Sequence, residues 1–90
     1  MLNMDSIITE YTDYCLICGR PKDDIHHCLM GSDRRHADED GLWIPVCRDC
    51  HSFIHDNPQA VTMSKIIGQI SYEREHTREE FRARYRHSYL

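Results

Sequence analysis

The sequence has no long apolar run, which excludes a membrane-spanning helix because such a helix needs about 18 or more consecutive apolar residues. Residues 1–14 also lack the basic start and apolar core of a secretory signal, since three acidic residues interrupt them. We therefore expect a cytoplasmic protein without a membrane partner. Repeats, low-complexity stretches and Gly/Ser linkers are absent too, so residues 1–90 are predicted to form a single domain.

Positive charge is scarce, with 11 Lys and Arg against 15 Asp and Glu and a net charge of −4. This balance argues against nucleic-acid binding through bulk charge. The distribution is uneven, however, because residues 81–90 carry three arginines and no acid. A polyanion should therefore contact that segment, the pair Arg34 and Arg35, or backbone amides aided by a metal.

A chain this short buries only about 60% of the surface that its unfolded form exposes, so a stable fold needs a further stabilising feature such as disulfides or a bound metal. There are five cysteines, an odd number, and no secretory signal, which favours metal ligation over disulfides. Two CxxC pairs have the spacing in which both thiolates reach one tetrahedral zinc ion about 2.3 Å away. The sequence thus predicts a structural Zn²⁺ site whose ligands are Cys15, Cys18, Cys47 and Cys50. The alternative is that these cysteines are free or redox-active thiols.

The two remaining details of the cysteine pattern concern Gly19 and Cys28. Gly19 follows the first CxxC and suits the left-handed backbone of a metal knuckle. Cys28 belongs to neither pair and lies next to two histidines. We interpret it as a small buried residue.

Four histidines form a second candidate site. His51 and His55 are four residues apart on a predicted helix, so both imidazoles project from one face and can bind one ion. His26 and His27 are adjacent in a predicted strand, where neighbouring side chains point to opposite faces. Only one of these two can join the ion, and the other is free for acid–base chemistry.

Local patterns predict a mixed α and β chain. Apolar runs indicate strands over 25–30 and 42–46, the second limited to an edge or an end by Pro45, and a helix over 47–55 should end at Asp56-Asn57-Pro58. The polar segment 31–41 is predicted to be a loop.

Two further helices are expected after that point. One should cover about 61–71, and the last should begin at a capping box formed by Thr77 and Glu80. In that last helix Phe81, Tyr85 and Tyr89 recur every four residues. We expect this aromatic stripe to pack against the metal core, rather than to stack on bases.

The order CxxC, His-His, apolar strand and CxxC-His-xxx-His resembles that of the HNH endonucleases. The stretch "HHCLMGSDRRHADEDGLWIPVCRDCHSFIH" carries the likeness, which the first CxxC extends to about half the chain. It is similar to the small phage-encoded HNH-like proteins and to the related RecA-dependent phage nuclease. The resemblance implies a small α+β fold: a zinc-stabilised, treble-clef-like ββα-metal core in residues 14–56 with helices over 60–90.

The same resemblance implies a divalent-metal-dependent DNA endonuclease acting in a bacterial host cell. His26, His51 and His55 correspond to ligands of a catalytic ion such as Mg²⁺, Mn²⁺, Ni²⁺ or Zn²⁺, and His27 corresponds to the general base. Neutral imidazoles would leave positions open for a phosphate oxygen and water. Arg34 or Arg35 could clamp an adjacent phosphate, or could simply face solvent.

The sequence departs from the family pattern in one respect: it lacks the asparagine that usually begins the second strand. Gly41 and Leu42 stand there, Asp40 is the nearest polar residue, and His36 is a further residue that could reach the site. Two other functions therefore remain: a catalytically silent zinc module that docks DNA or a phage or recombination protein, and a fold in which the histidines complete a second structural zinc site. A homodimer is compatible with each.

Overall fold

The computed structural model describes residues 4–90, and residues 1–3 of the acidic N-terminal stretch lie outside the described residues. The fold is a small α+β arrangement of one two-stranded sheet and four α-helices within this range. In chain order the elements are β1 (Asp24–His27), a 3₁₀ turn η1 (Gly31–Asp33), α1 (Arg34–Asp40), β2 (Trp43–Val46), α2 (Arg48–Asp56), α3 (Pro58–Tyr72) and α4 (Arg78–Tyr85).

The sheet pairs β1 with β2 in antiparallel register, with His26 opposite Ile44 and His27 opposite Trp43. Pro45 lies opposite Ile25, which is tolerated because each strand of a two-stranded sheet has a free edge for the missing N–H. The second predicted strand is confirmed, whereas the first ends at His27, earlier than expected.

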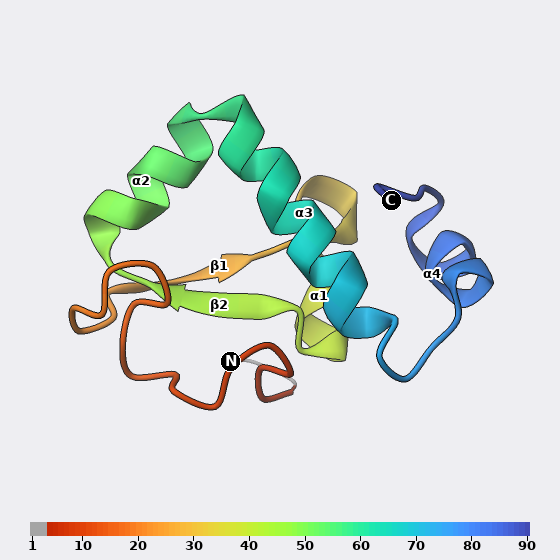
Figure 1. The fold of residues 1–90 in the computed structure, drawn as a ribbon, viewed down its shortest axis with the longest axis horizontal. Coiled ribbons are helices and arrows are strands. Elements are labelled where there is room, and N and C mark those ends of the chain that lie inside the picture. The colour runs from red at the N-terminus through yellow and green to blue at the C-terminus, as the bar shows by residue number, and fades with distance from the viewer. Residues whose placement is uncertain (1–3) are drawn as a thin grey trace.

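Helices α2 and α3 form an arch on one side of the two strands, and the N-terminal segment runs along the other side (Figure 1). The predicted end of the helix at Asp56-Asn57-Pro58 is confirmed, but the next helix begins directly afterwards, so that only Asn57 separates α2 from α3. Asn57 Oδ1 accepts hydrogen bonds from the first free amides of α3, and Pro58 occupies the first helical position, where its missing N–H costs nothing. Helix α3 therefore begins before the predicted residue 61.

The prediction of a loop over 31–41 is wrong, because η1 and α1 fill this segment. Only Ala37 of α1 is buried, so the helix has almost no apolar periodicity to reveal it. Gly41 ends the helix with a left-handed φ of 71°, and its N–H bonds to carbonyls of the last turn. Glu39 and Asp40 of α1 have partners in α4, and Asp38 has one in β1, which local patterns do not show.

The core consists of two clusters. One surrounds the cysteines and comprises Cys15, Cys28, Ile44, Val46, Cys47 and Ile54. The other joins α1, α3 and α4 and comprises Leu29, Ala37, Leu42, Tyr72, Phe81 and Tyr85, with Tyr89 packed against it. The aromatic stripe is packed inside the molecule, but the predicted contact with the metal core is wrong, because the stripe belongs to this second cluster and not to the one that holds the cysteines. Phe81 and Tyr85 are fully buried and so unavailable for base stacking.

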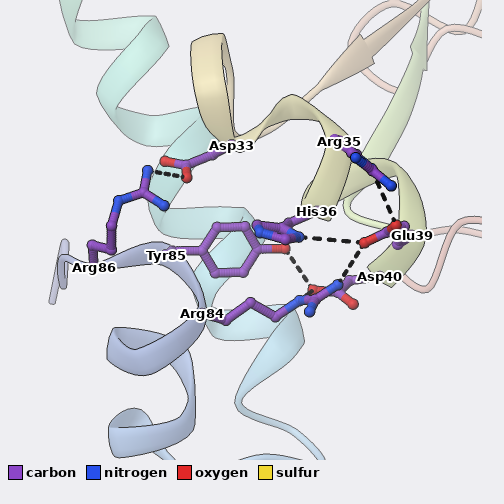
Figure 2. A network of polar contacts seen from close by, with 8 residues as sticks. All are labelled: Asp33, Arg35, His36, Glu39, Asp40, Arg84, Tyr85 and Arg86. Atoms are coloured by element: carbon purple, nitrogen blue, oxygen red, sulfur yellow. Dashed lines mark hydrogen bonds and ion pairs between the residues drawn. The ribbon is translucent and has the colours of Figure 1, made fainter.

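Helix α4 begins at the predicted capping box, in which Thr77 and Glu80 satisfy each other's backbone amides. Its far end is fastened to α1 by the polar network in Figure 2, where Arg84 Nε donates to Asp40 Oδ2 at 2.6 Å and Arg86 Nη2 to Asp33 Oδ1 at 2.7 Å. Two of the three arginines in residues 81–90 therefore form ion pairs within the molecule. In the described part of the chain, no helix combines the length and apolarity that crossing a bilayer would require.

Candidate functional site

The four predicted cysteine ligands come together. Their Sγ atoms all lie within 4.8 Å of one another, and those of Cys18 and Cys47 are 3.6 Å apart. This agrees with tetrahedral zinc, whose sulfur ligands at about 2.3 Å from the ion lie roughly 3.8 Å from each other. The cluster could bind a structural metal such as zinc. Cys28 lies outside it and is fully buried, as predicted.

Local geometry explains how the two CxxC pairs converge. The first pair lies in a tight turn, in which Gly19 has a left-handed φ of 80° and donates its N–H to the Cys15 carbonyl at 2.9 Å. The second pair lies at the start of α2, where Cys47 is the N-cap residue and accepts a hydrogen bond from the Cys50 amide. One turn and one helix start therefore present the four thiols to a common point.

Arg20 is a residue of this cluster that the sequence analysis missed. Its Nε donates to Cys18 Sγ and its Nη2 to Cys47 Sγ, both at 3.3 Å. The guanidinium lowers the pKa of the Cys18 thiol to about 6 and so favours the thiolate, the form that binds metal. The signal in the sequence was a basic residue two positions after the second cysteine of the knuckle.

Three of the four predicted histidines form a second cluster. One ligand nitrogen from each of His26, His51 and His55 lies within 4.8 Å of the others, and the Nε2 atoms of His51 and His55 are 3.0 Å apart. His26 is 1% exposed. Burial, aided by the neighbouring histidines, lowers the pKa of His26 to about 4, so its imidazole is neutral at pH 7 and can act as a ligand.

Two of these rings have one nitrogen within hydrogen-bond distance of another side chain. His51 Nδ1 lies 3.2 Å from Asp24 Oδ2, and His26 Nε2 lies 2.8 Å from Ser64 Oγ. Because a carboxylate only accepts, His51 donates through Nδ1–H and has its lone pair on Nε2, the atom that faces His55 Nε2. Neither Asp24 nor Ser64 was identified from the sequence, because nothing in the spacing of either residue marks it.

His27 lies apart from the other three histidines, as strand alternation predicts. Its Nε2 is 3.3 Å from Oδ1 of Asp38, and both side chains are mostly buried. Asp38 was not predicted as a site residue, because the polar sequence of its segment indicated a loop. Once residues 34–40 are helical, Arg34 and Asp38 are four apart and share a face.

Two adjoining cavities connect these groups. The larger, of about 740 Å³, is lined by His27, Asp38, Arg34 and Arg35 among others. The smaller, of about 240 Å³, is lined by the three clustered histidines and also by His27 and Arg34. His27 and Arg34 therefore line both cavities. The cavity beside His27 and Asp38 is thus next to the cavity beside the three-histidine cluster.

The two arginines differ in their surroundings. Arg34 has no ion-pair partner among residues 4–90, whereas Arg35 Nε lies 3.6 Å from Glu39 Oε2 and its side chain is 86% exposed. Arg34 is thus the freer guanidinium beside His27.

Two residues that the sequence analysis considered lie elsewhere. Asp40 accepts hydrogen bonds from Arg84 and Tyr85, so it does not stand in for the missing asparagine beside His27. His36 Nδ1 lies 3.3 Å from Glu39 Oε1, and its ring meets the edge of Tyr85. Both side chains face α4, because helix α1 turns them away from the face that carries Asp38.

Comparison with known proteins gives one match. Residues 9–74 match the family described as "Protein of unknown function (DUF968)". This span contains every cysteine and histidine of the two clusters, together with Asp38 and Ser64, and it stops before α4. No curated protein and no solved structure matches the chain.

Proposed function

The chain belongs to the family described as "Protein of unknown function (DUF968)", and we propose that it is a divalent-metal-dependent DNA endonuclease of the HNH type. The observation that carries the proposal is the position of the His27–Asp38 pair beside the cluster of His26, His51 and His55, with a cavity that both share. Hydrolysis of a phosphodiester needs a base and a source of positive charge within reach of one phosphate. In the proposed site His27 would supply the base, and a divalent ion held by the histidine cluster would supply the positive charge together with Arg34.

The proposed fold is a ββα-metal core supported by a treble-clef-like zinc knuckle. In this reading β1, β2 and α2 form the core, and the four-cysteine cluster holds a structural Zn²⁺. The helix that carries Cys50 also carries His51 and His55, so folding around zinc sets the orientation of two histidines of the second cluster.

The second ion would be held by His26, His51 and His55. Imidazole nitrogens suit Zn²⁺ and Ni²⁺ better than Mg²⁺ or Mn²⁺, which prefer oxygen ligands, and three neutral ligands leave coordination positions open for substrate and water. When bound, a divalent ion there would polarise the phosphodiester and stabilise charge on the leaving 3′ oxygen. The low pKa of His26 supports this assignment, because a neutral ring is the ligating form.

His27 is assigned the role of general base. The Asp38 carboxylate can only accept, so it takes the Nε2–H of His27 and leaves Nδ1 free to receive a proton. A water molecule then loses one proton to Nδ1 while its oxygen bonds to phosphorus and the bond from phosphorus to the 3′ oxygen breaks. The leaving 3′ oxygen takes a proton from solvent water, which gives a 5′-phosphate and a 3′-hydroxyl. Asp38 is a positioning residue, because it acts through His27.

Arg34 is assigned to phosphate binding. Its guanidinium lines both cavities and has no ion-pair partner within residues 4–90, so it can meet a phosphate at little cost. DNA is the proposed partner, and binding is expected to be local because the net charge is −4. A phage origin and a bacterial cytoplasmic location accompany this proposal.

Cleavage assays test the proposal. Supercoiled plasmid and single-stranded DNA are incubated with Mg²⁺, Mn²⁺, Ni²⁺ or Zn²⁺ and wild-type protein, His27→Ala or the control His87→Ala, whose histidine is exposed and outside both clusters. Wild type and the control should cut, and His27→Ala should not, although it binds the same amount of metal. If folded, metal-loaded wild type cuts neither substrate, the alternative is favoured: a catalytically silent zinc module that docks DNA or a phage or recombination protein.

A further inference from the structure

Ser64 connects helix α3 to the three-histidine cluster. The residue is 4% exposed, and its Oγ lies 2.8 Å from His26 Nε2 and 3.3 Å from the carbonyl oxygen of Cys28, to which it donates. Helix α3 lies outside the segment 14–56 in which the sequence places the metal-binding core. A buried hydroxyl from this helix nevertheless reaches the most buried histidine of the cluster.

Counting protons shows which form of His26 this arrangement favours. A serine hydroxyl has one proton, and here it is donated to the Cys28 carbonyl. Ser64 must then accept its second hydrogen bond from His26, so the ring carries its proton on Nε2 and has a lone pair on Nδ1. In the opposite arrangement Ser64 donates to Nε2, and the carbonyl of the fully buried Cys28 loses this partner.

We propose that Ser64 is a positioning residue that holds His26 as the Nε2–H tautomer, so that His26 coordinates the metal ion through Nδ1. The inference rests on the metal site of the proposed function, but it does not depend on DNA cleavage. Asp24 acts in the same way on His51, with the nitrogens exchanged. Two of the three ligand rings thus have their tautomers set by side chains outside the histidine motif.

Close packing keeps Ser64 in place. Gly68, one turn further along α3, approaches Cys28 so closely that an added Cβ would lie 2.9 Å from the Cys28 Cβ. The helix therefore rests directly on the residue that follows β1 by one position. This contact fixes the distance of Ser64 from both His26 and the Cys28 carbonyl.

The test compares wild type with Ser64→Ala and with Ser71→Ala. Ser71 is a matched control, because it is a buried serine of the same helix that lines a different cavity beside Tyr72. Long-range ¹H–¹⁵N spectra of the imidazoles, taken on protein with zinc in the cysteine cluster, report the tautomer of His26 before and after Zn²⁺ fills the histidine site. Wild type and Ser71→Ala should show Nε2–H, and Zn²⁺ should shift the Nδ1 resonance.

Ser64→Ala should show a mixture of tautomers and about 10- to 100-fold weaker metal binding at the histidine site, the usual loss when such a partner is removed. Ser64→Thr, which keeps the hydroxyl, should recover most of the affinity, whereas a purely steric role would not predict this. The proposal is overturned if wild-type His26 carries its proton on Nδ1 or binds metal through Nε2, or if Ser64→Ala binds as tightly as wild type.

The outcome is separable from that of the proposed function. A protein that shows the predicted tautomer and metal response but cuts no DNA would leave the inference standing and contradict the nuclease. A wild type whose histidine cluster takes up no divalent ion at all would overturn both.

Discussion

Tyr85 in α4 donates its phenolic proton to Oδ2 of Asp40, at the end of α1, over 2.6 Å. The same carboxylate oxygen accepts from Arg84, so one acidic residue ties the C-terminal helix to the helix that carries Asp38 and Arg34 (Figure 2). The attachment stabilises a helix with a single buried residue of its own. It also pairs the Arg84 guanidinium inside the molecule, so this positive charge is not available to an external polyanion.

Removing this hydroxyl should destabilise the fold. Tyr85→Phe is expected to lower the free energy of unfolding by about 1–2 kcal/mol at pH 7, because a buried hydrogen bond to a charged group is lost. Urea denaturation followed by circular dichroism measures the change. Tyr11→Phe is the control, since Tyr11 is 71% exposed, and it should unfold with wild type.

The difference should shrink at alkaline pH. Burial, aided by the bond to Asp40, raises the pKa of Tyr85 above the value of about 10 that it has when unfolded. Above pH 10 the unfolded chain releases this proton while the native chain keeps it, so wild-type stability falls as pH rises. Tyr85→Phe lacks the group, and an equal gap between the two proteins at pH 7 and pH 11 would contradict the assignment.

The cysteine cluster should be required for folding. Cys47→Ser is expected to abolish the cooperative thermal transition and the bound zinc, because assembly of such a site and folding are coupled. Cys28→Ala is the matched control, since its thiol is buried but outside the cluster. Elemental analysis should find one zinc per cysteine cluster in the control. Retention of zinc and helix content in Cys47→Ser would contradict a structural site.

Asp38 should matter for rate and not for metal content. Asp38→Asn replaces an acceptor-only carboxylate with an amide, whose NH₂ can donate to His27 Nε2 and favour the other tautomer, so it should lose part of the roughly 10²- to 10⁴-fold that a positioned base contributes. Metal binding should stay as in wild type. The control Asp13→Asn changes an exposed carboxylate away from the cavities and should cut normally. An unchanged pH–rate profile in Asp38→Asn would argue against a role through His27.

Gly41 should tolerate a side chain poorly. Its φ is 71°, and a Cβ there would collide with the backbone oxygen of Asp5, so Gly41→Ala combines backbone strain with displacement of the N-terminal segment. Gly31 has a similar φ of 65° but open space around it, so Gly31→Ala isolates the strain, which costs about 1–2 kcal/mol. Thermal melts should rank Gly41→Ala well below Gly31→Ala, and equal losses would show that the contact is unimportant.

Much of the fold could be predicted because it depends on neighbours in sequence. The two-residue spacing within each CxxC and the four-residue spacing of His51 and His55 are properties of a turn and a helix. Strand alternation likewise predicts that only one residue of the pair His26 and His27 points to the other histidines, and the structure shows His26 there. The capping box at Thr77 is equally local.

The remainder depended on contacts between distant segments. Helix α1 has one buried residue, so no apolar periodicity indicated it, and its Glu39 and Asp40 are paired by Arg84, more than 40 positions away. The side chains of Arg20 and Ser64 reach Cys47 and His26 across 27 and 38 positions. Spacing along the chain determined which residues could ligate metal. Packing of α1 and α3 onto the strands decided which side chains hold those ligands and which histidine meets Asp38, because such contacts form only when the whole chain closes around its core.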